Sequence, residues 1–346
     1  MTTVTILGAG AMGSALATPL VQAGHDVRLW GTHLDGRLVA AVLAGRPHPR
    51  TAVVVPSAVA AFDAAELAPA LDGADVVVLA VSSVGVHDIA TLAAPHLDGV
   101  EAVLLTSKGF AVDAQGRVQL LPQTVTAAVA AAGHEAPPVV AVGGPCKANE
   151  VAAGQPTAAL YAADDLAEAA RWARFVSTDA YRADFSADRD GVELCAALKN
   201  AVAIALGVAD GLTEAGQAPF HNLKAAAFAQ GLAEMRALLE AERCDPWTTL
   251  SLAGAGDLEV TGLSGRNKVF GVKLGLGQPA PAALAEMAAL EQTVEGVDAV
   301  RLVRQFTAQR HPVLAQSLPL LNAVHAVVHD GAPVTAIVEA ALGGRS

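Results

Sequence analysis

The first half of the chain alternates short apolar runs with stretches whose composition favours helix. The predicted strands are Val4–Leu7, Asp26–Trp30, Val53–Val55, Val76–Ala80, Val103–Thr106, Val139–Val142, Ala158–Tyr161 and Tyr181–Phe185. Several are apolar at every position, which is typical of parallel strands buried on both faces. Helical segments such as Val86–Ala94 and Val118–Ala132 separate them. This alternation predicts a doubly wound α/β domain over residues 1–187.

The pattern changes near Asp188, after which almost no strand signal remains. Long helical stretches are predicted instead, over Asp190–Gly211, Pro219–Glu242, Pro281–Leu290, Val297–Gln309 and Val313–Val328. Pro219, Pro281 and Pro312 lie where helices could start or stop. We therefore expect a second, all-α domain over residues 188–346, with the active site where the two domains meet.

The first predicted strand runs directly into the motif Gly8-x-Gly10-x-x-Gly13. A helical stretch and a second strand follow within about thirty residues, as a βαβ unit requires. Gly8 allows a tight turn, Gly10 lets the backbone approach a pyrophosphate, and Gly13 lets the helix pack closely on the strand. The helix then begins with Ala11 and Met12 and directs free N–H groups at the phosphates. The motif predicts a Rossmann-like dinucleotide-binding domain, against the alternative of a glycine turn kept only for packing.

Composition and charge limit the choice of partner and compartment. Of the 346 residues 53% are hydrophobic, and the net charge of −12 argues against nucleic acid or an anionic membrane as partner. Cys146, Cys195 and Cys244 lie far apart without metal-ligand spacing, which favours a reducing cytoplasm. We see no signal peptide and no apolar run long enough to cross a bilayer. The many alanines of the helical half could serve a homodimer interface.

Because the chain is acidic, cations in apolar surroundings are candidate ligands for anions. Lys108 follows an apolar strand directly, where a ligand crevice is expected. Lys199 lies in the stretch CAALKNAVAIALGVADGL, a helix apolar on nearly every side. Burial favours the neutral form of a lysine, so that it can act as a general base. The alternatives are a solvated loop lysine at 108 and a lysine that snorkels to the surface at 199.

Two further segments combine glycine turns with polar residues. Gly143–Ala148 follows a strand and could hold an anion on its backbone N–H groups, or it could be an ordinary tight turn. Asp257 lies among small residues and could orient a lysine or a substrate hydroxyl. Arg266 can bind a phosphate bidentately, and Asn267 can add a neutral hydrogen bond. The alternative is a helix cap followed by a basic surface turn.

These segments, in this order after the glycine turn, resemble the NAD(P)-dependent sn-glycerol-3-phosphate dehydrogenases of bacterial type. The matching stretches are GAGAMGSALA, TSKG (106–109), GGPCKANEVAAGQPTA (143–158), ALKNAVAIALGVADG (197–211), AGAGDL (253–258), GRNKVFG (265–271) and VEG (294–296). The resemblance implies reversible hydride transfer between dihydroxyacetone phosphate and sn-glycerol 3-phosphate with NAD or NADP, feeding glycerophospholipid synthesis.

The resemblance also implies roles for single residues. Lys199 would accept the proton of the alcohol. Asp257 would form a hydrogen bond near the reacting hydroxyl and Lys199, and Lys108 would contact both cofactor and substrate. The residues implied to bind the substrate are Lys108, Gly144, Cys146, Lys199, Asp257, Gly265, Arg266 and Asn267. Those expected to bind the cofactor, from the motif, the second strand and the resemblance together, are Gly8, Gly10, Ala11, Met12, Gly13, Thr32, His33, Lys108, Ala148, Arg266, Thr293 and Glu295. No metal ligand is expected.

The chain departs from the family pattern at three positions that bear on the substrate. Cys146 stands for a serine or threonine, Lys147 for an aromatic residue, and Gly265 for the serine before Arg-Asn. Because two hydroxyl donors are lost, a related dehydrogenase acting on another polyol or sugar phosphate stays open. An NAD(P)-binding sensor without catalysis is a further alternative, and the presence of Lys199 and Asp257 argues against it.

The choice of cofactor also stays open. No acidic residue directly follows Trp30 at the end of the second strand, where an NAD enzyme often binds the ribose. Thr32, His33 and Arg37 could bind a 2′-phosphate, whereas Asp35 could serve NAD. The sequence slightly favours NADP(H).

Overall fold

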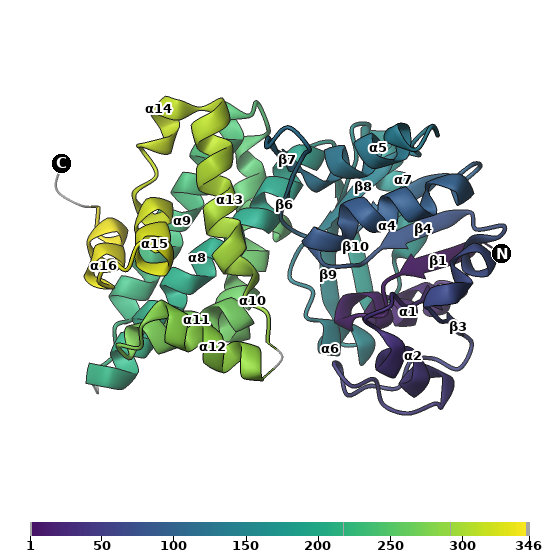
Figure 1. Cartoon of the computed structure of the whole chain (residues 1–346), viewed down its shortest axis with the longest axis horizontal. Coiled ribbons are helices and arrows are strands. Elements are labelled where there is room, and N and C mark those ends of the chain that lie inside the picture. Colours follow the sequence, from purple (N-terminus) through teal and green to yellow (C-terminus); the bar gives the residue numbers. More distant parts are fainter. Residues whose placement is uncertain (1, 217, 291, 344–346) are drawn as a thin grey trace. The chain divides into compact units, whose positions relative to one another are not determined.

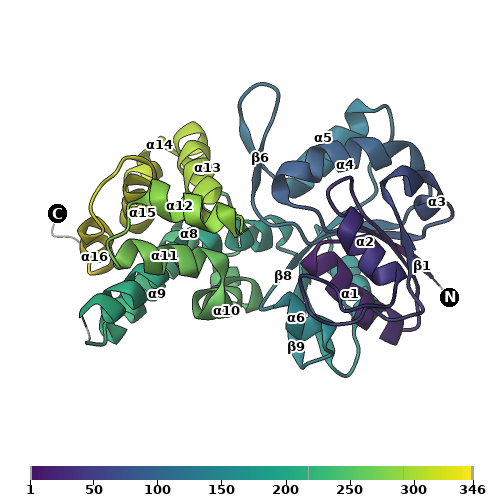
Figure 2. The ribbon, with the colours of Figure 1, turned by 60° about the horizontal axis from the view of Figure 1, so that its bottom comes forward.

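The structure is a computed structural model that describes residues 2–216, 218–290 and 292–343. The chain forms two compact units (Figures 1 and 2). The first unit comprises residues 1–111 and 119–193, and the second comprises 112–118 and 194–346. The first unit is built on a sheet and the second is helical, so the predicted fold class is confirmed.

An eight-stranded sheet is the frame of the first unit, as far as the structure describes it. Its order is β10-β9-β8-β5-β4-β1-β2-β3. The strands are β1 (Thr3–Leu7), β2 (Asp26–Trp30), β3 (Ala60–Phe62), β4 (Val76–Leu79), β5 (Ala102–Leu105), β8 (Val139–Gly143), β9 (Thr157–Ala162) and β10 (Tyr181–Ser186). Neighbouring strands are parallel except β8 and β9, which are antiparallel. The chain thus winds outward from β1 to both sides, with one reversal near the β10 edge.

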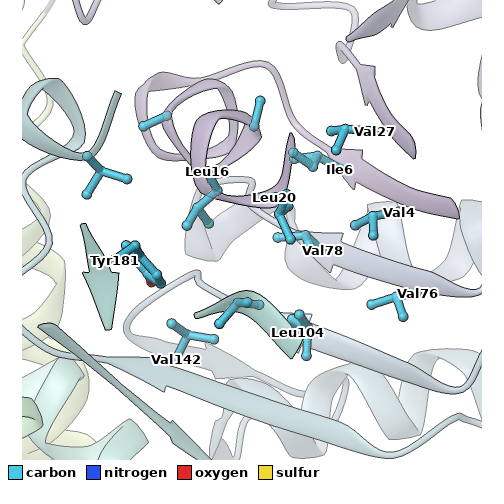
Figure 3. Close-up of a cluster of buried hydrophobic side chains, with 14 of the residues drawn as sticks. Val4, Ile6, Leu16, Leu20, Val27, Val76, Val78, Leu104, Val142 and Tyr181 are labelled. Atoms are coloured by element: carbon cyan, nitrogen blue, oxygen red, sulfur yellow. The ribbon is translucent and has the colours of Figure 1, made fainter. Parts of the chain in front are cut away.

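Helices cover both faces of this sheet. They are α1 (Ala11–Gln22), α2 (Gly36–Leu43), η1 (Ala64–Glu66), α3 (Leu67–Leu71), η2 (Ser83–Gly85), α4 (Val86–Ala93), η3 (Ala94–His96), α5 (Leu121–Ala131), α6 (Ala148–Ala152) and α7 (Leu166–Val176). Successive side chains of a strand point to opposite faces. Val76 and Val78 therefore join one apolar cluster, with Leu16 and Leu20 of α1 (Figure 3), while Val77 joins a second cluster on the other face.

The second unit consists mainly of helices. They are α8 (Arg189–Gly216, which begins in the first unit), α9 (His221–Ala241), η4 (Pro246–Leu250), the π-helical turn η5 (Leu252–Gly256), α10 (Asp257–Ser264), α11 (Arg266–Gly275), α12 (Ala280–Ala289), α13 (Glu295–Arg310), α14 (Pro312–Ala315), α15 (Pro319–His329) and α16 (Thr335–Ala341). Glycines let α8 and α11 approach closely. A Cβ on Gly207 would lie 2.9 Å from Cα of Gly271, and one on Gly211 would lie 2.9 Å from Cα of Gly275.

Helix α8 is long and apolar enough to cross a membrane by length and composition alone. This contradicts the sequence expectation that no apolar run reaches that length. In the structure its apolar window is entirely buried within the protein, as in the core helix of a globular domain. Its composition is therefore explained by packing against its neighbours.

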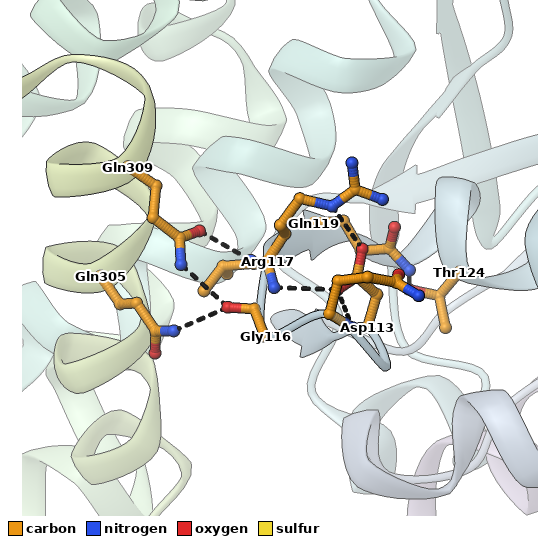
Figure 4. Close-up of polar contacts among 9 residues, drawn as sticks. Asp113, Gly116, Arg117, Gln119, Thr124, Gln305 and Gln309 are labelled. Carbon is orange, nitrogen blue, oxygen red and sulfur yellow. Dashed lines mark hydrogen bonds and ion pairs between the residues drawn. The ribbon is translucent and has the colours of Figure 1, made fainter.

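A small hairpin, β6 (Phe110–Val112) and β7 (Val118–Leu120), contributes its tip to the second unit. The Gly116 carbonyl accepts hydrogen bonds from Nε2 of Gln305 (3.1 Å) and of Gln309 (2.9 Å), both on α13. The backbone N–H of Val118 donates to Oε1 of Gln309 at 2.9 Å (Figure 4). These bonds explain why residues 112–118 group with the helices.

Three predicted elements are wrong in detail. Val53–Val55 forms no strand: Val54 makes only an isolated bridge with Pro47, and the edge strand is β3. In the predicted helix Val118–Ala132 the first three residues form β7, and the helix starts at Leu121. The predicted helix Val313–Val328 is divided into α14 and α15, because Pro319 can begin a helix but cannot continue one.

Candidate active site

The glycine turn of the first unit has the geometry that a dinucleotide needs. Gly8 has φ of +113°, and a Cβ there would lie 2.9 Å from the Ala80 carbonyl oxygen. A Cβ on Gly13 would lie only 2.0 Å from the Gly8 carbonyl oxygen. Around Gly10, by contrast, the nearest atom to a built Cβ is Nη1 of Arg50 at 3.6 Å. The turn therefore packs tightly on the strand side and leaves room over Gly10, so it fits a bound pyrophosphate.

The helix that follows the turn begins without a side-chain cap. The N-cap residue of α1 is Gly10, which has no side chain to cap the helix. Ala11 and Met12 are the first two helical residues. The first turn of α1 holds no acidic residue. Its backbone N–H groups and partial positive charge are thus directed to an anion without competition from a carboxylate.

The end of β2 carries the residues expected near the adenosine ribose. Oδ2 of Asp35 accepts hydrogen bonds from the backbone N–H (3.0 Å) and the hydroxyl (2.9 Å) of Thr32. Asp35 is 7% exposed, so its carboxylate is largely committed to this turn. His33 and Arg37 are exposed beside it. This edge therefore exposes the His33 side chain and the Arg37 guanidinium, and it keeps the Asp35 carboxylate in the turn.

Lys108 follows β5, in a turn that is tied to the neighbouring strand. Ser107 donates its hydroxyl hydrogen bond to the Val81 carbonyl at 2.7 Å, and Thr106 donates to the Leu79 carbonyl at 3.2 Å. Glu193, at the start of α8, is 1% exposed. Burial raises the pKa of the Glu193 carboxyl to about 8, while the positive charge of Lys108 acts in the opposite direction. Sequence reasoning missed Glu193, although an acidic residue beside an apolar helical run was its signal.

The glycine turn after β8 also requires a glycine. Gly144 has φ of +112°, and a Cβ there would lie 3.1 Å from Cα of Ala159. Cys146 is partly buried, with Sγ 3.9 Å from the Ala158 carbonyl oxygen. Ala148 is the first residue of α6, which has only five residues.

Lys147, the N-cap residue of α6, lies in the same turn as Cys146. Its ammonium nitrogen lies 3.5 Å from a carboxylate oxygen of Glu150, one helical turn further along the chain. Both side chains of this pair are more than a third exposed. The charge of Lys147 is therefore balanced locally, within α6 and its cap.

In the second unit, Lys199 and Asp257 form a buried ion pair. Lys199 on α8 is 7% exposed, and Asp257, the first residue of α10, is 1% exposed. Nζ of Lys199 contacts Oδ1 of Asp257 directly. The π-helical turn η5 brings Asp257 to this place, and a Cβ on Gly254 would lie 2.1 Å from the Thr249 carbonyl oxygen. A buried ammonium is thus held in place by a carboxylate.

Hydrogen bonds through the side-chain amides of Asn200 and Asn267, here called the amide bridge, join α8, α11 and α13. Asn200 directly follows Lys199. Nδ2 of Asn267 donates to Oδ1 of Asn200 at 2.9 Å, and Oδ1 of Asn267 accepts from the Gly296 N–H at 2.8 Å. A Cβ on Gly296 would lie 2.5 Å from the Asn200 carbonyl oxygen, so only glycine fits at that point of α13. Sequence reasoning gave Asn200 no role, although it adjoins Lys199 in the ALKN stretch.

Arg266 and Glu295 form an exposed ion pair next to the amide bridge, through Asn200. Nη2 of Arg266 lies 3.0 Å from Oε1 of Glu295, and Nδ2 of Asn200 lies 3.5 Å from its Oε2. Thr293, two residues before Glu295, is exposed. Gly265 is the N-cap of α11, and a Cβ there would lie 2.9 Å from the Thr261 carbonyl oxygen. Two groups of contacts thus involve α8, α10, α11 and α13: Lys199 pairs with Asp257, and Asn267, Glu295 and Arg266 are linked through Asn200. Thr293 and Gly265 flank the second group in the sequence.

The comparisons with known proteins concern the chain as a whole. The model for the N-terminus of NAD-dependent glycerol-3-phosphate dehydrogenase matches residues 3–169, and the model for the C-terminus matches residues 188–339. The chain is 36% identical over 334 residues to a glycerol-3-phosphate dehydrogenase [NAD(P)+] of Halorhodospira halophila, covering 96% of this chain and 94% of the relative. It is 32% identical to an NADP(+)-dependent glycerol-3-phosphate dehydrogenase of Archaeoglobus fulgidus, covering 97% of both chains.

A solved structure agrees as well. The crystal structure of glycerol-3-phosphate dehydrogenase from Coxiella burnetii matches with a TM-score of 0.83 at 29% sequence identity and covers 99% of each chain. Both family models, the relatives and this structure cover nearly the whole chain, which confirms the resemblance seen in the sequence. The chain belongs to the NAD-dependent glycerol-3-phosphate dehydrogenase family.

Proposed function

We propose that this protein catalyses reversible hydride transfer between dihydroxyacetone phosphate and sn-glycerol 3-phosphate. The observation that carries the proposal is the buried pair of Lys199 and Asp257. Asn200, the next residue after Lys199, accepts a hydrogen bond from Asn267. The chain matches proteins named glycerol-3-phosphate dehydrogenase over nearly the full length of both sequences. NAD or NADP is the cofactor, and when bound it carries the hydride.

Lys199 moves the proton in this proposal. In oxidation its neutral amine takes the proton of the substrate hydroxyl, and in reduction the ammonium returns it to the forming alkoxide. Asp257 holds Nζ in place and stabilises the ammonium through their ion pair. From the first unit, Lys108, the backbone of Gly144 and the Cys146 thiol are the residues that we propose contact the substrate.

Arg266 and Asn267 hold the substrate phosphate in this proposal. The present partner of Arg266 is Glu295, and both side chains are more than a third exposed. An exposed pair of this kind contributes little, about 0–1 kcal/mol, so the guanidinium can exchange Glu295 for a phosphate. Asn267 is buried and fixed by two hydrogen bonds, which makes its position independent of the ligand. Gly265 shapes the start of the same helix.

For the cofactor, we propose a preference for NADP(H). Asp35 is engaged by Thr32, whereas His33 and Arg37 are exposed at the end of β2. This arrangement favours a 2′-phosphate over a bare ribose hydroxyl. The remaining proposed cofactor contacts are Lys108, Ala148, Arg266, Thr293 and Glu295. We also propose that the enzyme works in the cytoplasm, in glycerophospholipid synthesis, without a nucleic-acid or membrane partner.

A substrate panel tests this proposal. The purified protein is mixed with NADH or NADPH and with dihydroxyacetone phosphate, unphosphorylated dihydroxyacetone or other ketose phosphates, and the loss of reduced-cofactor absorbance is followed. Dihydroxyacetone phosphate should give the highest kcat/KM, and the unphosphorylated ketone almost none. Turnover only with another ketose phosphate would refute the proposed substrate. It would support the alternative suggested by Cys146 and Gly265, a dehydrogenase that acts on another polyol or sugar phosphate.

A further inference from the structure

The loop between α2 and β3 packs against the glycine turn through a buried histidine. His48 is fully buried, and its Nε2–H donates to the Ala9 carbonyl oxygen at 3.0 Å. Its other nitrogen, Nδ1, accepts from the backbone N–H of Arg50 at 3.2 Å. Because Nδ1 accepts, the proton of the neutral ring is on Nε2. Burial lowers the pKa of His48, the hydrogen bond to Ala9 acts in the opposite direction, and the positive charge of Arg50 lowers it further.

The backbone of this loop is closed on itself. The N–H of His48 donates to the Val53 carbonyl at 2.8 Å, and the N–H of Ala52 donates to the His48 carbonyl at 2.8 Å. Ala52 has φ of +59°, the left-handed region that residues other than glycine seldom adopt. An alanine stays in that region only where the surrounding bonds hold it there. The loop therefore has a defined shape, fixed to the glycine turn at His48.

This shape places the guanidinium of Arg50 over Gly10. Nη1 lies 3.6 Å from the position that a Cβ of Gly10 would take. Gly10 is the residue at which the backbone approaches the cofactor pyrophosphate in this motif. The first turn of α1 offers no carboxylate to pair with Arg50. The chain has a net charge of −12, so a doubly negative pyrophosphate needs a local positive charge. The guanidinium of Arg50 supplies one at this point.

We propose that Arg50 binds the pyrophosphate shared by NAD and NADP, and that His48 is the positioning residue that holds Arg50 over the glycine turn. The inference rests on the proposed use of a nicotinamide dinucleotide. It adds Arg50, a residue outside the glycine motif, to the groups that bind the pyrophosphate. The 2′-phosphate is expected elsewhere, at the end of β2. Arg50 should therefore act on both cofactors equally.

Direct binding measurements test this assignment without requiring turnover. Arg50→Gln should raise the Kd of NADH and of NADPH by the same factor, on the order of ten- to a hundredfold for a lost charge-assisted hydrogen bond. ADP-ribose should lose affinity similarly, whereas adenosine, which has no phosphate, should not. Arg46→Gln removes the same charge from an exposed site on the same loop and should leave every Kd unchanged.

The result also separates this proposal from the proposed function. Wild-type protein that binds both cofactors but reduces no ketose phosphate would refute the function and leave the test of Arg50 valid. Equal Kd values for Arg50→Gln and wild type would overturn the assignment. A loss confined to NADPH would also overturn it, since Arg50 would then bind the 2′-phosphate.

His48 is tested by a double-mutant cycle, since a buried side chain can also affect stability. His48→Gln keeps an amide donor for Ala9 and should retain most cofactor affinity, whereas His48→Ala should weaken NADH binding nearly as much as Arg50→Gln does. In the Arg50→Gln background, His48→Ala should add little further loss of affinity, because both changes remove the same contact. Fully additive losses would contradict the positioning role.

Discussion

Replacing Glu193 with glutamine tests how this protein accommodates a buried carboxyl group. Glu193 is 1% exposed, and among the residues that the structure describes its Oε2 has no hydrogen-bond partner. Burial is the main reason that its pKa rises from the ordinary 4.5 to about 8, and the negative charge of Asp190 adds to the rise. The positive charges of Lys108 and Arg189 oppose it. At neutral pH the folded protein therefore holds Glu193 largely protonated.

The sign of the pH dependence follows from where the proton binds more tightly. The pKa is higher in the folded state, so this group's contribution to stability is complete below about pH 4.5 and is lost as the pH rises to about 8. The loss over that window is on the order of 5 kcal/mol at most, since each pKa unit corresponds to about 1.4 kcal/mol. Glutamine has a similar shape and does not titrate, so Glu193→Gln should not show this loss.

Thermal unfolding of the two proteins at a series of pH values measures the effect. The melting temperature of Glu193→Gln relative to wild type should rise steadily between about pH 4.5 and 8 and then level off. Glu135→Gln, which changes an exposed glutamate of the same unit, should show no such trend. A difference that is constant or falls with pH would refute the reasoning.

Two further predictions concern the two sites. Gly13→Ala places a Cβ 2.0 Å from the Gly8 carbonyl oxygen and should weaken binding of both cofactors by on the order of tenfold or more in a fluorescence titration. Gly36→Ala, where a Cβ meets nothing within 4 Å, is the control, and an unaffected Gly13→Ala would contradict the packing argument. Asn267→Ala leaves the buried N–H of Gly296 unpaired, so it should cost about 1–3 kcal/mol of stability and raise KM for the phosphorylated ketone. Unchanged unfolding and KM would show that the amide bridge has no such role.

Local patterns predicted most of the fold, and they singled out Lys199 and Asp257, which the structure joins in one buried ion pair. The glycine motif is informative because each glycine answers a separate steric demand within a few residues of sequence. Lys199 could be singled out because a charge in an apolar helix requires a partner, and the structure supplies Asp257. In both cases the signal lies within one element.

Other features depend on contacts between distant segments, and there the sequence was insufficient. Val53–Val55 has the composition of a strand, but the chain closes on His48 at that point and reaches the sheet only at β3. Val118 continues an apparent helix in composition, yet its N–H bonds to Gln309 far along the chain. His48 and Arg50 lie in a loop of ordinary polar composition, and only their contacts with the glycine turn show their place.

The most direct test of the account is reduction of dihydroxyacetone phosphate by NADH and NADPH with wild type and two lysine variants. Lys199→Ala removes the buried ammonium paired with Asp257, and Lys224→Ala removes one paired with Asp210 at 2.9 Å, outside the proposed site. We predict turnover by wild type and Lys224→Ala, and a kcat lower by about 10²–10⁴-fold for Lys199→Ala with cofactor binding intact. Equal kcat values for the three proteins would contradict the assignment of Lys199, and no turnover by any of them would contradict the proposed reaction.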